Sequence, residues 1–94
     1  MSAPVARVIL YTRAFCGYCV AAQRLLEAKG IPFEHIDVTG DHGQRRWLAE
    51  VTGRHTVPQV FINGRPVGGY TDLRDLDRRG ELDRLLEQAP VEPS

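Results

Sequence analysis

Cys16 and Cys19 are the only two cysteines of this chain, and two residues separate them. They follow an apolar, β-branched run at residues 8–12 and precede residues 20–26, which have helical spacing. A Cys-x-x-Cys pair at a strand-to-helix junction is typical of a dithiol that cycles with its disulfide. Only the thiolate attacks a disulfide, and the free N–H groups at a helix N-terminus favour an anion. We therefore expect Cys16 to attack and Cys19, one turn further along the helix, to resolve the mixed disulfide.

Two other interpretations of the cysteine pair are half of a zinc site and a pair of buried packing residues. Zinc usually takes about four ligands. The histidines, His35, His42 and His55, form no His-x3–5-His spacing, and there is no second Cys-x-x-Cys. The two residues between the cysteines, Gly17 and Tyr18, also argue against close packing. The glycine favours exposed backbone, and the aromatic ring offers a substrate an apolar wall.

The composition indicates one soluble domain spanning residues 1–94. The chain has 94 residues and a formal net charge of zero, with its basic residues scattered. This balance gives no electrostatic reason to expect nucleic acid or a membrane as partner. Neither a signal peptide nor an apolar run of about 18 residues is present, so we expect a cytoplasmic location. Cysteine pairs there are more often catalytic or metal-binding than structural.

The elements that must position the cysteines form an α/β pattern, β-α-β-α-β-β-α. Residues 42–52 are expected to turn Trp47, Leu48 and Val51 inward, and Asn63-Gly64 predicts a hairpin whose second strand lies at the sheet edge. This order predicts a four-stranded mixed sheet with helices on both faces. The expected strands are residues 5–11, 33–38, 58–62 and 65–68; the expected helices are 17–29, 42–52 and 71–79 with a short continuation at 82–86; residues 89–94 are expected to be a frayed tail.

Three motifs occur together in the order and spacing of a known family. The first is Cys16-Gly17-Tyr18-Cys19, which follows Tyr11-Thr12-Arg13 in the sequence. The other two are Thr56-Val57-Pro58 and Gly69-Tyr70-Thr71-Asp72. Over about residues 5–88 the chain resembles the small bacterial dithiol glutaredoxins, which have a thioredoxin-like fold. The resemblance implies glutathione-dependent reduction of protein disulfides and of glutathione mixed disulfides.

Two positions depart from the family pattern. Arg13 stands where the family usually has Lys, and Gly17 where it usually has Pro. Proline at the first helical position is rigid. We therefore expect Gly17 to shift the reduction potential relative to the family range of about −200 to −230 mV.

The resemblance also implies a glutathione site. It implies that Val57–Pro58 is a cis peptide beside the cysteines and that the Val57 backbone pairs with the cysteine of glutathione. The turn before the third helix presents N–H donors to the γ-glutamyl carboxylate, and Asp72 faces its ammonium; an ordinary helix cap would use the same residues. Arg13 would bind the glycyl carboxylate. Arg45 would bind it too, unless it is simply a surface arginine. The implied glutathione-binding residues are Arg13, Tyr18, Arg45, Thr56, Val57, Pro58, Gly69, Tyr70, Thr71 and Asp72.

Flanking residues are left unassigned. Arg54 and His55 border the implied groove without an assigned role, and Trp47 is interpreted as core or groove wall.

Two other functions remain open. Some glutaredoxins without the motif proline hold a [2Fe–2S] cluster in a dimer, through the active-site cysteines and two glutathiones; Cys16 would be the ligand here. A redoxin served by thioredoxin reductase is the other alternative, although Arg13 and Thr71-Asp72 would then have no glutathione to bind. The resemblance implies disulfide-containing or glutathionylated proteins as partners, ribonucleotide reductase among them, and otherwise a monomer.

Overall fold

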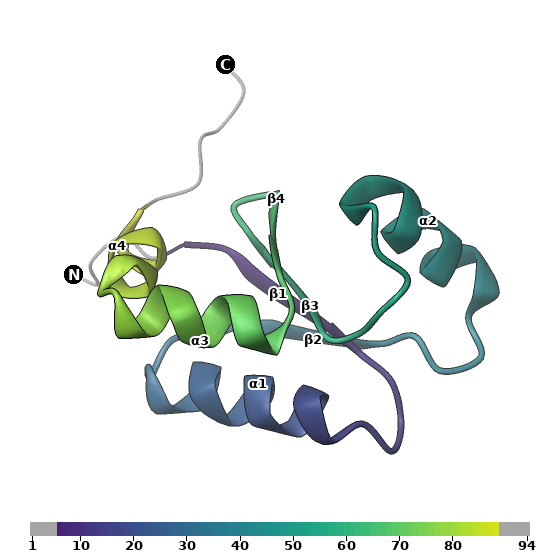
Figure 1. Cartoon of the computed structure of the whole chain (residues 1–94), viewed down its shortest axis with the longest axis horizontal. Helices are drawn as coiled ribbons and strands as arrows, with labels where there is room; N and C mark the ends of the chain where they lie inside the picture. The colour runs from purple at the N-terminus through teal and green to yellow at the C-terminus, as the bar shows by residue number, and fades with distance from the viewer. Residues whose placement is uncertain (1–5, 89–94) are drawn as a thin grey trace.

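The computed structural model describes residues 6–88, which form eight helices and strands (Figure 1). Val5, the first residue of the predicted first strand, and the predicted tail at residues 89–94 lie outside the described residues. The elements are β1 (Val8–Thr12), α1 (Gly17–Ala28), β2 (Glu34–Asp37), α2 (His42–Thr52), β3 (Gln59–Ile62), β4 (Arg65–Gly68), α3 (Tyr70–Arg78) and α4 (Glu81–Glu87).

The four strands form one mixed sheet in the order β2-β1-β3-β4. β1 pairs with β2 in parallel and with β3 antiparallel, and β3 pairs antiparallel with β4. Asn63 and Gly64 turn the hairpin with φ of 52° and 81°, as a two-residue turn with both φ positive requires. The predicted mixed sheet, hairpin and edge strand are therefore confirmed.

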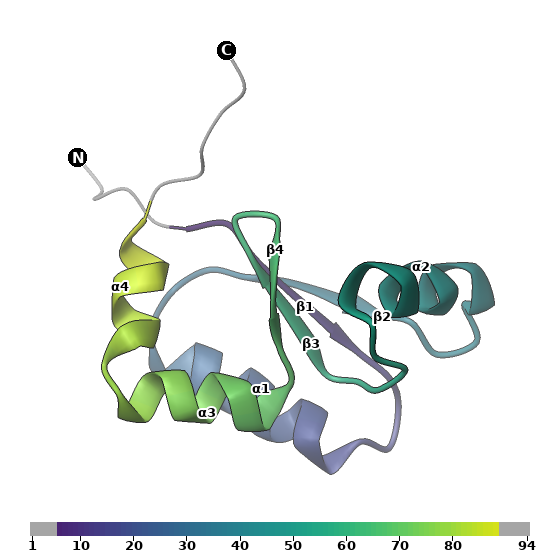
Figure 2. The same ribbon diagram turned by 45° about the horizontal axis from the view of Figure 1, so that its top comes forward.

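Helices cover the two faces of the sheet unequally, as Figures 1 and 2 show. On one face, α1, α3 and α4 bury Leu26, Leu73 and Leu82 against the strands. On the other, only α2 packs on the sheet. Its smaller cluster of buried residues consists of Tyr11, Val38, Leu48 and Phe61.

The predicted inward face of α2 is wrong for two of its three residues. Leu48 is buried, but Trp47 is 42% exposed and Val51 43% exposed. The small cluster beneath α2 accepts one side chain from the helix, which is Leu48. The Trp47 ring lies along the cluster's edge, stacked on Phe61 with ring centroids 5.7 Å apart.

Local chemistry fixes where the helices begin and end. Gly30, with φ of 70°, follows the end of α1, and Gly53, with φ of 72°, ends α2. Asp41 caps α2 by accepting the Gln44 N–H at 3.0 Å. Gly80, with φ of 76°, separates α3 from α4. Within residues 6–88, each helix is too short or too polar to cross a bilayer.

Candidate active site

Cys16 occupies the N-cap position of α1, where the chain leaves β1 and turns into the helix. Its Sγ accepts the backbone N–H of Cys19 at 3.1 Å, in the way that a capping oxygen would. The side chain is half-buried, and Sγ lies 3.8 Å from the carbonyl oxygen of Val57. Both cysteines are free thiols. The predicted junction of strand, thiol and helix is therefore present.

Cys19 is enclosed, with 4% of its surface exposed. Burial raises the pKa of its thiol to about 12, and its hydrogen bond to Cys16 acts in the same direction. A backbone hydrogen bond from Arg13 opposes this shift only in part. Cys19 is consequently a protonated thiol at neutral pH, beside a neighbour whose sulfur accepts a hydrogen bond from the helix.

A loop before β3 forms the second wall of the site. The Val57–Pro58 peptide bond is cis, as the resemblance implies. Gln59 is buried, and its Nε2 donates to the Thr56 carbonyl oxygen at 3.0 Å. This side chain ties the loop to the sheet. Sequence reasoning missed it, although a glutamine inside an otherwise apolar strand was the available signal.

The turn between β4 and α3 forms the third wall. Asp72 Oδ2 accepts the Gly69 N–H at 3.0 Å and lies 2.7 Å from Nη1 of Arg54. This ion pair lowers the pKa of the Asp72 carboxyl, which is therefore ionised at neutral pH. Gly68 has a φ of 121°, and a Cβ there would lie 2.3 Å from Asp72 Oδ2. Asp72 thus acts as a helix cap, and Arg54, left unassigned from the sequence, is its partner.

Two adjoining hollows, of about 250 and 330 Å³, together form what we call the thiol groove. They share Tyr18, Thr56 and Val57, and Cys16 lies in the larger one. Every predicted site residue except Cys19 lines this groove. Four further residues that sequence reasoning did not assign also line the groove: Phe15, Gly17, Arg54 and His55. The full lining of the larger hollow is Arg13, Phe15, Cys16, Gly17, Tyr18, Arg45, His55, Thr56 and Val57. The full lining of the smaller hollow is Tyr18, Arg54, Thr56, Val57, Pro58, Gly69, Tyr70, Thr71 and Asp72.

Cys19 does not line the thiol groove. It lines a neighbouring hollow together with Thr12 and His35, whose Oγ1 and Nε2 atoms lie 2.6 Å apart, and Cys16 lines this hollow as well. Cys16 therefore adjoins both spaces, whereas Cys19 adjoins only the second.

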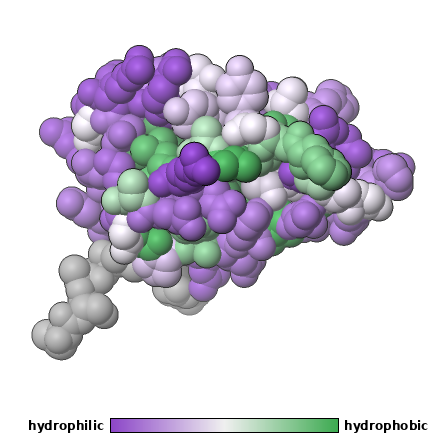
Figure 3. Space-filling model, turned by 90° about the horizontal axis from the view of Figure 1, so that it is seen from below, coloured by the Kyte–Doolittle hydropathy of each residue, from purple (hydrophilic) through white to green (hydrophobic). Residues whose placement is uncertain are grey.

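Apolar side chains project around the start of α1. Phe15 is fully exposed and has a φ of 58°, and Val20 is 48% exposed. Figure 3, which views the molecule from the side of α1, shows apolar surface among hydrophilic residues. A positive φ is uncommon outside glycine and is often found at functional sites. The neighbourhood of Cys16 thus offers apolar contacts as well as charges.

The described part of the chain contains no group of three or more His, Cys, Asp or Glu residues arranged to hold a metal ion. Residues 6–88 include both cysteines and all three histidines, so the zinc interpretation has no ligand set there. Cys16 is the one thiol of this part of the chain that is accessible to an external ligand.

Comparisons with known proteins agree with this geometry. The family model described as Glutaredoxin matches residues 8–67. "Glutaredoxin 3" of Escherichia coli K12 is 42% identical over 83 residues, which are 88% of this chain and the whole of that protein. The solution structure of a Brucella melitensis glutaredoxin is 43% identical, with a TM-score of 0.80 over 88% of this chain and 90% of that one. The crystal structure of a buckwheat glutaredoxin–glutathione complex is 29% identical, with a TM-score of 0.78 over 86% and 76%. The chain, with its thioredoxin-like fold, therefore belongs to the glutaredoxin family of glutathione-dependent thiol–disulfide oxidoreductases.

Proposed function

We propose that Cys16 is the nucleophile and Cys19 the resolving thiol of this oxidoreductase, acting on protein disulfides and glutathione mixed disulfides. The observation that supports this most strongly is the asymmetry between the two thiols. Cys16 opens into the thiol groove and its sulfur accepts the Cys19 N–H, whereas Cys19 is buried and its pKa is raised to about 12. A thiol that must react first needs access and anion stabilisation; only Cys16 has both.

Glutathione fits the distribution of charges and donors along the thiol groove. The Val57 backbone, next to Cys16, can pair with the cysteinyl residue of glutathione as an added strand would. At one end, the α3 N-terminus and Asp72 suit the γ-glutamyl carboxylate and ammonium. At the other, Arg13 and Arg45 suit the glycyl carboxylate.

The reaction takes two forms that share their first step. The Cys16 thiolate attacks one sulfur of the substrate disulfide, and the other sulfur leaves as a thiolate that takes a proton. With a protein disulfide, the Cys19 thiol loses its proton and attacks Cys16 Sγ, which gives the Cys16–Cys19 disulfide and the reduced protein. With a glutathione mixed disulfide, Cys16 takes the glutathionyl group. A second glutathione thiolate then attacks it, giving glutathione disulfide and free Cys16.

Serine variants of the two cysteines separate these roles. Cys16→Ser is expected to abolish both activities, because nothing else in the groove can attack. Cys19→Ser is expected to retain turnover of a glutathione mixed disulfide and to lose reduction of a protein disulfide. The measurement is NADPH consumption coupled through glutathione reductase. Equal loss of both activities in Cys19→Ser would overturn the assignment. A parallel assay with thioredoxin reductase tests the other electron donor, and turnover there without glutathione would favour that alternative.

A cluster-bridged dimer is a second candidate, supported by the setting of Cys16. A [2Fe–2S] cluster takes about four thiolates, and the described residues offer one accessible thiol per chain. The ligands would therefore be Cys16 from each of two chains and two glutathione thiols. Gly17 leaves the helix start open, because a Cβ added at this residue would have no other atom within 4 Å. Anaerobic reconstitution with iron, sulfide and glutathione tests this: a colourless monomer by absorbance and sedimentation rejects it.

We further propose a cytoplasmic location and, without a cluster, a monomer. The partners would be disulfide-containing or glutathionylated proteins, such as ribonucleotide reductase. In the Cys19→Ser variant, protein partners would remain attached to Cys16 as mixed disulfides. Mass spectrometry of proteins trapped in the native host identifies them, and cell fractionation checks the location.

A further inference from the structure

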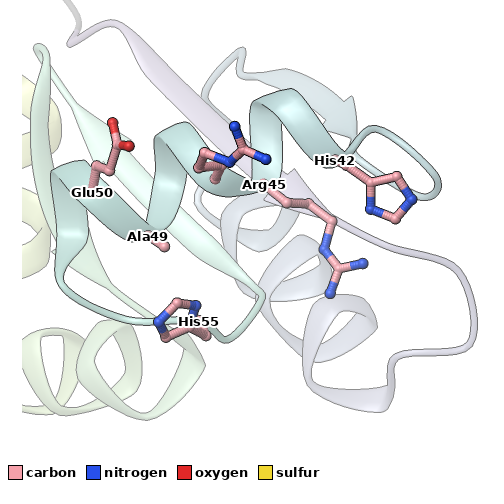
Figure 4. A pocket seen from close by; sticks show the side chains of 6 residues that line it. His42, Arg45, Ala49, Glu50 and His55 are labelled. Atoms are coloured by element: carbon pink, nitrogen blue, oxygen red, sulfur yellow. The ribbon is translucent and has the colours of Figure 1, made fainter.

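A second groove lies beside the thiol groove, along the exposed side of α2 (Figure 4). We call it the basic groove; its volume is about 550 Å³. Five of its lining residues come from α2, and His55 comes from the loop that leads to Val57. The lining residues are His42, Arg45, Arg46, Ala49, Glu50 and His55.

The charges of the basic groove are unbalanced. Two guanidinium groups line it against the single carboxylate of Glu50, and the two imidazoles add hydrogen-bonding groups. Figure 4 shows that the Glu50 side chain points away from the guanidinium of Arg45 and from His55. Arg45 and Arg46 are exposed, and neither forms an ion pair with another residue among 6–88.

Arg54 provides a contrast close by. Its guanidinium lies 2.7 Å from Asp72 Oδ2, so the protein itself supplies its counter-charge. The acidic residues are concentrated elsewhere: six of the chain's 12 belong to α3 and α4. The cations of the basic groove are thus available to a carboxylate-bearing partner.

The basic groove runs directly into the thiol groove. Arg45 and His55 line both the basic groove and the hollow that contains Cys16. A polypeptide whose cysteine lies at Cys16 can therefore continue along α2 without leaving the surface. Arg46 and His42 line only the basic groove, and so lie outside the proposed glutathione site.

We propose that the basic groove docks an acidic segment of disulfide-containing protein substrates, next to the cysteine that Cys16 attacks. The proposal rests on the proposed function, since it extends the substrate along the surface from the same thiol. Arginine guanidinium groups bind carboxylates through paired hydrogen bonds. Unbalanced cations beside a reactive group also raise the rate of encounter with anionic partners, in a salt-dependent way.

Model peptides test the proposal. Each peptide carries an intramolecular disulfide, and its flanking residues are glutamate in one peptide and glutamine in the other. The second-order rate constant for reduction by the reduced protein is measured by mass spectrometry. The acidic peptide is expected to react about fivefold faster at about 20 mM salt, and less than about twofold faster at about 200 mM.

A charge reversal then assigns the effect to this groove. Arg46→Glu is expected to lower the advantage of the acidic peptide at least about threefold, because it removes a cation and adds an anion. Arg24→Glu makes the same change at an exposed arginine of α1 that lines none of these grooves, and is expected to leave the advantage unchanged. Both variants should turn over the mixed disulfide of glutathione and 2-mercaptoethanol at the wild-type rate.

Three results would overturn the proposal. The first is equal rates for the two peptides in the wild-type protein at low salt. The second is a loss in Arg46→Glu that is the same for both peptides. The third is a dimer in sedimentation at low salt that Arg46→Glu dissociates, because the groove would then hold a second copy of the chain. Loss of turnover with the small mixed disulfide in the wild-type protein would instead contradict the proposed function.

Discussion

Cys16 and Cys19 lie one helical turn apart, yet their surroundings give them opposite properties. Cys16 caps α1 and opens into the thiol groove. Cys19 points into the protein and, because burial raises its pKa to about 12, keeps its proton. A resolving thiol benefits from this arrangement, since it stays unreactive until the mixed disulfide forms beside it.

The first prediction concerns the reactivity of Cys19 alone. In Cys16→Ser, native Cys19 is expected to react with iodoacetamide at least about tenfold more slowly at about pH 8 than in the urea-unfolded chain. A folded-state pKa above the unfolded value means that the thiolate appears later as pH rises. Because burial is the largest cause of the raised pKa and remains in this variant, the native rate should climb at a higher pH than the rate of the unfolded chain. Mass spectrometry of timed samples measures both rates; equal rates in the native and unfolded chains would contradict the prediction.

Gly68 is the residue on which the position of Asp72 depends most closely. A Cβ at Gly68 would lie 2.3 Å from Asp72 Oδ2, and its φ of 121° is costly for other residues. Gly68→Ala is therefore expected to displace Asp72 and to raise the KM for glutathione about tenfold, with a loss of about 1–3 kcal/mol of stability. Coupled kinetics and urea unfolding measure the two effects.

Gly64→Ala is the matched control for this prediction. Gly64 also has a positive φ, of 81°, but no atom lies within 4 Å of its Cβ position. The variant should lose stability while retaining the wild-type KM. If both variants changed KM equally, backbone strain rather than the contact with Asp72 would be the cause.

At the residue scale, the sequence could predict those parts of the site that depend on residues close together in the chain. The thiol at a helix start and the capping Asp72 follow from neighbours a few positions away. The Arg54–Asp72 ion pair joins residues 18 positions apart, and depends on how the loop before β3 meets α3. The tie from Gln59 to Thr56 depends likewise on the cis turn, which only the family resemblance could predict.

Among the elements, α2 supports both grooves with little burial of its own. It carries Arg45 and Arg46, begins at the Asp41 cap and ends at Gly53. Leu48 is its only buried residue. Its capping therefore has a larger share in its stability than is usual for a core helix.

Removal of the α2 cap should destabilise the protein measurably. Asp41→Ala leaves the Gln44 N–H without its 3.0 Å acceptor, and is expected to cost about 1 kcal/mol. Urea unfolding followed by the fluorescence of Trp47, which lies on α2, measures the change. Glu50→Ala removes the same charge from the exposed side of the same helix and should cost less than about 0.5 kcal/mol. Equal losses would show that charge, and not capping, is responsible.

Element boundaries were predictable because caps and breakers are local. Asp41, Gly30, Gly53 and Gly80 mark the predicted ends of helices within a residue or two of where they lie. The inward face of α2 was not predictable, because periodicity identifies apolar positions but not the width of the surface that receives them. Val51 is exposed since the cluster beneath α2 ends at Leu48.

The whole molecule is a sheet whose two faces are covered by unequal layers of helices. The order of elements, the Asn63-Gly64 turn and Pro66 sufficed to predict a mixed four-stranded sheet with one hairpin at its edge. How the helices divide between the faces depends on the paths of the connections. The result is a larger core on the side of α1, α3 and α4, and a cluster of four buried residues, Leu48 of α2 among them, on the other side. Lys29 adds ion pairs from the end of α1 to Asp77 and Asp83, on the larger core's side only.

This asymmetry predicts that α2 opens more easily than the rest of the molecule. Regions with few buried apolar contacts exchange their amide hydrogens through local opening, at lower free energy than the core. Leu48 and its neighbours in α2 should therefore exchange at an opening free energy about 1–3 kcal/mol below that of Ala22 in α1. Native-state hydrogen exchange measures both helices in one experiment.

Leu48→Ala tests this comparison directly, because Leu48 is the one buried side chain that α2 contributes to the smaller cluster. The variant should lower the opening free energy of α2 more than that of α1. If the two helices instead exchanged at one shared free energy in both proteins, α2 would open only with global unfolding. The basic groove would then be as rigid as the core, whereas local opening would let α2 adjust to the different acidic segments that we propose it docks.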